Sequence, residues 1–331
     1  MEYIVGIDQG SSKTDVIVVN EKGRIFGRGR SGGGDHFLNG MEHAIGKIKE
    51  ALTMALRQAS IQIEQISLLA SGLTGADWPH EYQMLREALT KETGIKNVIV
   101  HNDCIPAMRS GLKTSYGAVL CAGSGLNCAV KSPDGEEFVF GYYIDDEDQG
   151  GTALGRRVLR SVFDAHSGVG ASTTLISRIL EYFQMTDVDK LLESLVNSKI
   201  PNVKTKDLAP IAFEVAAEGD LVALSLLKKF GYDMAKYVVA GLKKFNLLKL
   251  ELDVVLSGGI FKCKVPILKE AVATFIHQYA PKVNIIEARF EPVVGAALLG
   301  LDEYYSSPLP EEVMDNIDHD CRKMDLLRGG D

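Results

Sequence analysis

The sequence predicts an α/β protein of two lobes, each a mixed sheet flanked by helices. Its 331 residues are enough for two ordinary domains. Apolar runs of strand length alternate with segments of helical periodicity. The order of strands, turns and helices in the first third of the chain also occurs again after residue 115. We therefore expect one sheet-and-helix unit used twice, with a cleft between the copies.

The first copy begins with three apolar runs, "YIVGID", "TDVIVVN" and "IFGRGR". The turn "EKGR" joins the last two, as in an antiparallel meander. Apolar residues from Gly40 to Ala59 have helical spacing and predict a helix that covers the sheet. "ISLLASGL", "EYQMLREALTKET" and "NVIVHND" then predict strand, helix and strand, so we expect a parallel crossover.

The second copy repeats this order. "YGAVLCAGSGLNCAVKSPDGEEFVFG" predicts two strands around a Gly-Ser loop, a turn and a third strand. "LDVVLSGG" and "VNIIEA" predict two more strands, and residues 265–279 and 293–305 predict helices. The expected division is a first lobe at 1–114 with helix 293–305 packed back on it, a second lobe at 115–292 with a helical insertion at 152–250, and a polar surface helix or frayed tail at 307–331.

The composition indicates a soluble, cytoplasmic protein with small-molecule partners. A net charge of -8 argues against nucleic-acid binding, which needs basic surface. The sequence shows neither a signal peptide nor an apolar run near the roughly 20 residues of a membrane span. Its five cysteines lack the spacing of a zinc site, so we expect reduced thiols.

Two Gly-Ser loops occupy equivalent hairpin bends. In "GIDQGSSKTDVIVVN", residues Gly10, Ser11 and Ser12 could aim several backbone N–H groups at an anion, although turns use the same residues for conformation alone. "CAGSGLNC" lies at the corresponding bend of the second copy. Two such loops facing each other predict a nucleotide between them.

A third glycine site, "VVLSGGIF", follows a buried strand. Gly258 and Gly259 would let a base or ribose lie on the backbone there, unless the pair serves only as a strand-to-helix turn.

Three aspartates, Asp8, Asp103 and Asp148, are expected to point from strand ends into the cleft. One could hold Mg²⁺ through water, and another could accept a proton from an attacking hydroxyl. Asp103 could equally cap the helix that follows it.

Seven segments in order resemble a known family: "GIDQGSSKT", "GLTGAD", "HNDCIPA", "CAGSGLN", "DQGGTALG", "LSGGIF" and "EPVVGAALLG". They match landmarks of the sugar kinase/Hsp70/actin superfamily and look like the N-acetylglucosamine kinase branch of the BadF/BadG/BcrA/BcrD ATPase family, over residues 3–303. The resemblance implies a ribonuclease-H-like fold whose two lobes close over ATP and a sugar.

The resemblance also implies roles for individual residues. It implies Asp103 as the catalytic base, Asp8 as a ligand of Mg²⁺ through water, and a homodimer. The implied ATP-binding residues are Asp8, Gly10, Ser11, Ser12, Lys13, Thr14, Gly123, Ser124, Gly125, Gly258 and Gly259. The implied substrate-binding residues are Asp35, His36, Asn102, Asp148 and Gln149.

Two positions depart from the family pattern. Asp35 stands where the family usually has Asn, and Gln149 stands where it has Glu. The first change replaces a donor-acceptor amide by an anion that only accepts. This suggests an amino sugar whose ammonium group pairs with Asp35.

Several aromatic and histidine residues near these motifs have two interpretations. His36 could bond a sugar hydroxyl or be merely solvated. Trp78 could stack on a sugar or anchor packing, and Tyr142 and Tyr143 could line the acceptor site or the core.

The leading interpretation is an ATP-dependent kinase of an amino sugar or N-acetylated amino sugar. The alternative is an ATPase that drives a conformational change in a partner protein, like the reductase and dehydratase activators of the wider family. Those activators hold an iron–sulfur cluster on closely placed cysteines, whereas the cysteines here are scattered, which disfavours this alternative. A nucleotide- or sugar-sensing protein with a degraded site is the third interpretation.

Overall fold

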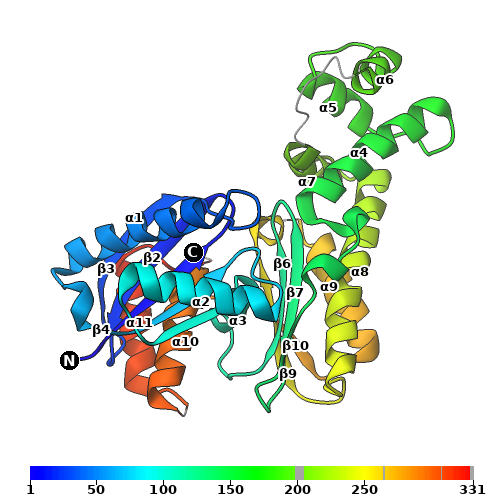
Figure 1. The fold of residues 1–331 in the computed structure, drawn as a ribbon. Coiled ribbons are helices and arrows are strands. Elements are labelled where there is room, and N and C mark those ends of the chain that lie inside the picture. The colour runs from blue at the N-terminus through cyan, green and yellow to red at the C-terminus, as the bar shows by residue number, and fades with distance from the viewer. Residues whose placement is uncertain (198–204, 264, 307, 329–331) are drawn as a thin grey trace.

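The computed structural model describes residues 1–197, 205–263, 265–306 and 308–328 and contains two five-stranded mixed sheets (Figure 1). The first sheet has the order β3-β2-β1-β4-β5 and the second has β10-β9-β6-β7-β8. In both sheets an antiparallel meander is extended by two parallel strands. The predicted repetition of one unit is confirmed.

The three central strands of the first sheet are buried on both faces, which stabilises the sheet. Its strands are β1 (Tyr3–Gln9), β2 (Lys13–Asn20), β3 (Ile25–Gly32), β4 (Ile66–Leu73) and β5 (Val98–Asn102). Helix α1 (Met41–Ala59) lies against β3, where a Cβ on Gly29 would come within 1.8 Å of the Ala51 carbonyl oxygen. Glycine is therefore required for this close packing. A 3₁₀ turn (Ile63–Gln65), α2 (Pro79–Thr93) and α3 (Cys104–Arg109) complete this region.

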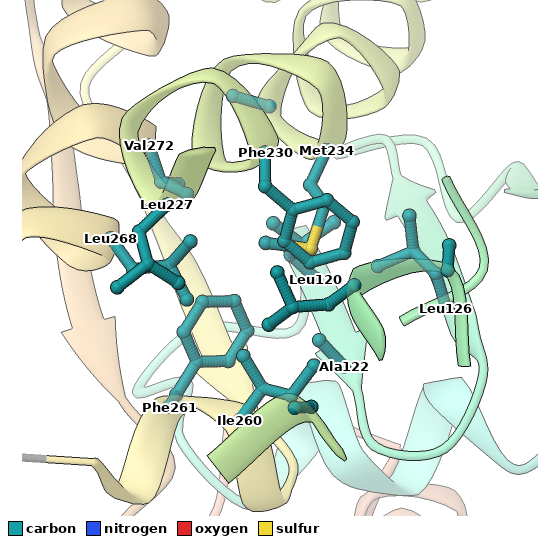
Figure 2. Close-up of a cluster of buried hydrophobic side chains, with 14 of the residues drawn as sticks. Leu120, Ala122, Leu126, Leu227, Phe230, Met234, Ile260, Phe261, Leu268 and Val272 are labelled. Carbon is teal, nitrogen blue, oxygen red and sulfur yellow. The ribbon is translucent and has the colours of Figure 1, made fainter. Parts of the chain in front are cut away.

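The second sheet consists of β6 (Gly117–Ala122), β7 (Leu126–Lys131), β8 (Glu137–Val139), β9 (Leu252–Ser257) and β10 (Val283–Glu287). Helices α8 (Leu221–Lys244) and α9 (Ile267–Tyr279) cover it. Figure 2 shows Phe230 and Met234 of α8 beside Leu120 of β6 in the core between these layers. Apolar burial of this kind is the main force that holds helix to sheet.

The segment from residue 150 to 217 is mainly helical in the residues that the structure describes, whereas α8, also within the predicted insertion at 152–250, packs on the second sheet. The segment contains α4 (Gly150–Ser167), α5 (Leu175–Tyr182), α6 (Val188–Val196), α7 (Ala209–Ala217) and the 3₁₀ turn Thr205–Leu208. Shorter 3₁₀ turns at Gly141–Tyr143 and Asp146–Asp148 lead into it, and another, Gly259–Lys262, follows β9. Helices α4, α5 and α6 extend away from the sheets (Figure 1).

The last two helices return to the first sheet. In α10 (Pro292–Tyr305), Ala297 packs so closely on β1 that a Cβ on Gly6 would lie 2.5 Å from its backbone nitrogen. Helix α11 (Glu311–Lys323) buries Val313, Ile317 and Cys321, and Asp320 accepts two hydrogen bonds from the Arg24 guanidinium. Residues 311–323 are thus a packed helix, not a frayed tail. In the described part of the chain, no helix is long and apolar enough to cross a bilayer.

Candidate active site

A cleft of about 460 Å³ lies between the two sheets and brings together most of the predicted site. Both Gly-Ser hairpins line it, and so do Asp8, Lys13, Asn102, Asp103 and Gly258. Further lining residues that the sequence analysis had not selected are Thr74, Gly75, Asp77, Cys104, Asn127, Ser257 and Pro292. Residues from distant parts of the chain therefore share one cavity.

The first hairpin, between β1 and β2, exposes Ser11 and Ser12 at its tip. It is closed by a hydrogen bond from the Gly10 amide to the Lys13 carbonyl (2.9 Å). Thr14 differs from the other predicted ATP-binding residues here, because its side chain is buried and its hydroxyl donates to the Gly32 carbonyl (2.9 Å). We therefore regard Thr14 as a support of the hairpin.

The second hairpin, between β6 and β7, is braced from behind by the start of α4. The amides of Gly151 and Thr152 donate to the carbonyls of Gly123 (2.8 Å) and Ser124 (3.0 Å). Gln149 accepts a hydrogen bond from the Leu126 amide through Oε1 (3.2 Å). Gln149 thus holds the start of β7, and its side-chain amide lies beside the second hairpin.

The two glycines of the third glycine site line different cavities. Gly258 has φ of 108° and lines the cleft, where a Cβ would come within 2.2 Å of the Ala122 carbonyl oxygen. Gly259 instead lines a neighbouring cavity of about 790 Å³, which also contains Gly123 and Ser124. The insertion supplies much of the remaining wall, including Lys206, Pro210 and Phe213. An apolar cavity that adjoins a phosphate-type loop suits a nucleoside.

Carboxylates crowd the other end of the cleft. Desolvation and the charge of Asp103 raise the pKa of Asp8 to about 7, although Lys13 and Arg328 lower it. Desolvation and the charge of Asp77 raise the pKa of Asp103 to about 6. Burial, and then the charge of a neighbouring acid, therefore makes each carboxyl group harder to ionise.

Asp77 is the acid that the sequence analysis missed. Its Oδ1 accepts a hydrogen bond from Nδ2 of Asn102 (2.9 Å), and its own amide donates to Oε2 of Glu81 (2.8 Å). Desolvation, Glu81 and Asp35 raise its pKa to about 6. The available signal was its place in "GLTGAD", four residues after a buried strand, whereas Asp8 lies within β1 and Asp103 directly follows β5.

Asp35 and His36 lie beside the cleft, next to Gly75. A Cβ on Gly75 would be 3.1 Å from Oδ1 of Asp35 and 3.4 Å from Nδ1 of His36. The Asp35 carboxylate also accepts from the Phe37 amide (2.9 Å). The solvated interpretation of His36 is wrong: its side chain is only 6% exposed and lies 3.6 Å from Glu81. Nδ1 of His36 is buried without a hydrogen-bond partner among the described residues.

The expectation that Asp148 points into the cleft is wrong. Its side chain is 4% exposed, and its carboxylate accepts hydrogen bonds from Arg157 (3.0 Å) and Tyr237 (2.9 Å) and pairs with Lys236 (2.5 Å). A buried carboxylate needs such partners, and here α4 and α8 supply them. Asp148 therefore anchors the turn before α4 to the insertion.

Trp78 and Tyr142 contact each other across the mouth of the cleft. Their rings are stacked at 6.1 Å between centroids with an interplanar angle of 10°. Trp78 precedes α2 of the first region, and Tyr142 follows β8 of the second. Tyr143 lies against Phe138 and is otherwise exposed. The pair is thus a contact between the two halves, and both rings keep exposed faces.

Comparisons with known proteins agree with this geometry. The N-acetyl-D-glucosamine kinase of Dictyostelium discoideum is 27% identical over 315 residues, covering 91% of this chain and 98% of that protein. The glucosamine kinase of Vibrio cholerae is 24% identical over 245 residues, covering 72% and 80% of the two chains. A solved structure from Chromobacterium violaceum, of a candidate N-acetylglucosamine kinase, has a TM-score of 0.66 at 20% identity, with 90% and 98% coverage.

The last likeness is evidence for the fold alone. The family is shown by a match over residues 5–300, which includes both sheets, both Gly-Ser hairpins and all the carboxylates of the cleft. The chain is a member of the BadF/BadG/BcrA/BcrD ATPase family.

Proposed function

We propose that the protein is an ATP-dependent kinase that transfers the γ-phosphate of ATP to a hydroxyl of an amino sugar or N-acetylated amino sugar. The observation that carries this proposal is the shared cleft, in which two Gly-Ser hairpins face a desolvated carboxylate, Asp103. Relatives that match 91% and 72% of the chain are named kinases of N-acetylglucosamine and glucosamine, respectively, which supports the acceptor class.

The hairpins would hold the triphosphate through their backbone N–H groups, and the neighbouring cavity beside Gly259 would hold the nucleoside. Lys13 would add a positive charge at the first hairpin. Phosphoryl transfer depends mainly on positioning and on electrostatic stabilisation of the transferred group. The two Gly-Ser hairpins, one from each lobe, would provide this positioning and stabilisation once the lobes close.

Asp103 would accept the proton of the attacking hydroxyl. A general base works best when its pKa is near the operating pH, and desolvation with the Asp77 charge brings the pKa of Asp103 to about 6. Asn102 lies directly before it and is fixed by hydrogen bonds to Asp77 (2.9 Å) and from the Cys104 amide (3.0 Å). The carboxylate is thereby held on a rigid strand end.

The cleft fits a bound magnesium ion. Mg²⁺ prefers oxygen ligands and usually retains waters while it binds nucleotide phosphates. Asp8 offers a carboxylate at the first hairpin whose pKa is raised by burial and then by the charge of Asp103, and a cation would favour its ionised form. Mg²⁺ would neutralise charge on the phosphates, with Asp8 holding it through water.

The acceptor end favours an amino sugar with a free ammonium group. Asp35, Asp77 and Asp103 influence one another electrostatically there, and His36 directs an unpartnered ring nitrogen beside Asp35. An ammonium would relieve the crowding of carboxylates. An acetamido group would offer no charge to Asp35.

The decisive experiment is a coupled assay of ADP release with Mg-ATP against hexoses, glucosamine and N-acetylglucosamine, beside a reaction without sugar. We expect strong stimulation by one amino sugar. Release at one rate regardless of sugar would favour a partner-coupled ATPase. Binding of ATP without turnover on any sugar would favour a sensor.

A substitution at Asp35 tests the ammonium contact. We expect Asp35→Asn to lower kcat/KM for glucosamine relative to N-acetylglucosamine by roughly tenfold, the scale of one lost charge-assisted contact. The matched control is Asp134→Asn, which removes an exposed carboxylate from a turn remote in sequence from the motifs. An unchanged ratio in Asp35→Asn would remove this residue from acceptor selection.

We also infer a homodimer built on the helical insertion. Helices α4, α5 and α6 extend from the sheets, and exposed apolar residues on or near the insertion include Val169, Tyr182, Leu192, Val196 and Leu221. Exposed apolar side chains such as these would contribute to a contact between two copies of the chain. Sedimentation equilibrium of the wild type and of a Val196→Glu, Leu192→Glu double variant tests this, and a monomeric wild type would contradict it.

A further inference from the structure

The residues that follow α11 return to the segment that precedes α10, next to the cleft residue Pro292. Leu327 forms an antiparallel bridge with Phe290. Two more backbone hydrogen bonds flank it, from the Glu291 amide to the Leu326 carbonyl (2.9 Å) and from the Arg328 amide to the Arg289 carbonyl (2.8 Å). Residues 326–328 thus pair with the segment that leads into α10. This pairing fixes the backbone position from which the Arg328 side chain extends.

The guanidinium group of Arg328 joins two segments that border the cleft. Its Nη1 donates to Oγ of Ser257 (2.7 Å), and its Nη2 donates to Oε2 of Glu291 (3.3 Å). Nε lies 3.2 Å from Oε1 of Glu291, and the two side chains are 16% and 18% exposed. Ser257 is buried, lines the cleft and directly precedes Gly258.

Glu291 continues this chain of contacts to the first hairpin. Its Oε2 lies 3.7 Å from Nζ of Lys13, which also pairs with Asp15 at 2.6 Å. Lys13 therefore sits between two carboxylates, one from β2 and one from the start of α10. The first hairpin, the start of α10 and the end of β9 are linked through one arginine, although they are far apart in the sequence.

We infer that Arg328 is a positioning residue of the nucleotide site. It holds Glu291 in place for Lys13 and holds Ser257 at the turn that carries Gly258, so that the hairpin of one lobe and the glycine turn of the other keep their spacing. An arginine suits this role because its planar group can bind a carboxylate and a hydroxyl at once in fixed directions. The identity of the nucleotide as ATP rests on the proposed function.

The test measures the dissociation constant of the non-hydrolysable analogue AMPPNP by calorimetry, in the presence of Mg²⁺ and without any sugar. We expect Arg328→Ala to raise the dissociation constant about tenfold, since it leaves Glu291 and Ser257 without their shared donor. Arg328→Lys keeps the charge but loses the forked geometry, so we expect an intermediate constant. The matched control is Arg322→Ala, whose exposed side chain pairs with Asp318 on the same helix; its constant is expected to equal that of the wild type.

Two further measurements separate positioning from simple anchoring of the chain. In steady-state kinetics, Arg328→Ala should raise KM for ATP while KM for the sugar stays within twofold of the wild type. Combined with Glu291→Gln, its effect on nucleotide binding should be less than the product of the two single effects, because the residues act through one contact.

Unchanged AMPPNP binding in Arg328→Ala and Arg328→Lys, with only a lower melting temperature, would overturn the inference. Arg328 would then serve only to anchor the end of the chain. Equal increases in KM for ATP and for sugar would overturn it as well. A wild type that binds AMPPNP but releases no ADP in response to sugar would contradict the proposed kinase, while the binding comparison would still decide the role of Arg328.

Discussion

Asp103 illustrates how neighbours determine the chemistry of a single carboxylate. It follows β5 directly and has helical backbone angles, and it caps α3 without a side-chain hydrogen bond. The sequence allowed two roles for Asp103, catalysis and helix capping. Its side chain makes no capping hydrogen bond to α3. Desolvation and Asp77 raise its pKa instead, which suits a proton acceptor near neutral pH.

We predict that Asp103→Asn lowers kcat by about 10²–10⁴-fold, the usual contribution of a general base. The amide keeps the shape of the side chain but cannot accept the proton, so folding and ATP binding should persist. Turnover of purified protein with saturating substrates measures this, together with circular dichroism to check the fold. Activity close to the wild type would remove Asp103 from the mechanism.

The pH dependence should follow from the same group. Only the ionised carboxylate can act as base, so kcat/KM should rise with pH through about 6 and level off above it. Asp77→Asn removes the neighbouring charge and keeps an acceptor for Asn102, so the acidic limb should move to lower pH. A limb that stays at the same pH in Asp77→Asn would show that this charge does not act on the base.

At the scale of elements, glycine turns allow the strands to end in the loops that line the cleft. Gly258 adopts a positive φ against the backbone of Ala122, and the turn is then anchored by Ile260 and Phe261. Figure 2 shows these two side chains beside Leu268 and Leu120 in the core of the second sheet. The turn is therefore rigid at the point where it borders the cleft.

The two adjacent glycines should respond differently to alanine. Gly258→Ala adds a Cβ 2.2 Å from the Ala122 carbonyl at a strained φ, so we expect a loss of stability of about 2 kcal/mol or more. Gly259→Ala meets no described atom within 4 Å and should fold normally while weakening nucleotide binding in its cavity. Urea unfolding and AMPPNP titration of both variants distinguish these effects. Equal stability of the two would contradict the packing argument.

Over the whole molecule, the two halves meet through apolar packing of α3 on β6, β7 and β9, and through a line of polar and aromatic contacts. Nδ2 of Asn127 donates to Oδ1 of Asn102 (3.3 Å), and the Gly141 amide donates to Asn127 (3.0 Å). The stacked rings of Trp78 and Tyr142 continue this line toward solvent. In the proposed kinase, a change along this polar and aromatic line would accompany the closure that excludes water during phosphoryl transfer.

Trp78 is the only tryptophan in the sequence and should report this closure. Addition of AMPPNP and sugar together should change its emission, because the ring stacks on Tyr142 of the other half and follows the cleft residue Asp77. Tyr142→Ala should lower the size of this change by removing the partner ring. Emission that is unaffected by ligands would argue that the halves do not move relative to each other near Trp78.

The assignment of residues 1–114 and 115–292 to two domains stays a prediction, as do the individual roles of the site residues. The order of strands and helices was predicted well because it depends on local patterns: alternation of apolar residues, helical spacing and glycine at turns. Because these patterns occur twice, the sequence also predicted two Gly-Ser hairpins that face each other, and both line the cleft.

Local patterns by themselves determined the fold class, the two Gly-Ser hairpins and the aspartates at strand ends, because these features need only neighbours along the chain. Only the tertiary structure decided which carboxylates share the cleft. It places Asp77 beside Asp103, turns Asp148 toward Arg157 and Lys236, and brings Arg328 to Ser257 and Glu291. Burial and charge pairing act between segments that are distant in sequence, and no spacing along the chain encodes those distances.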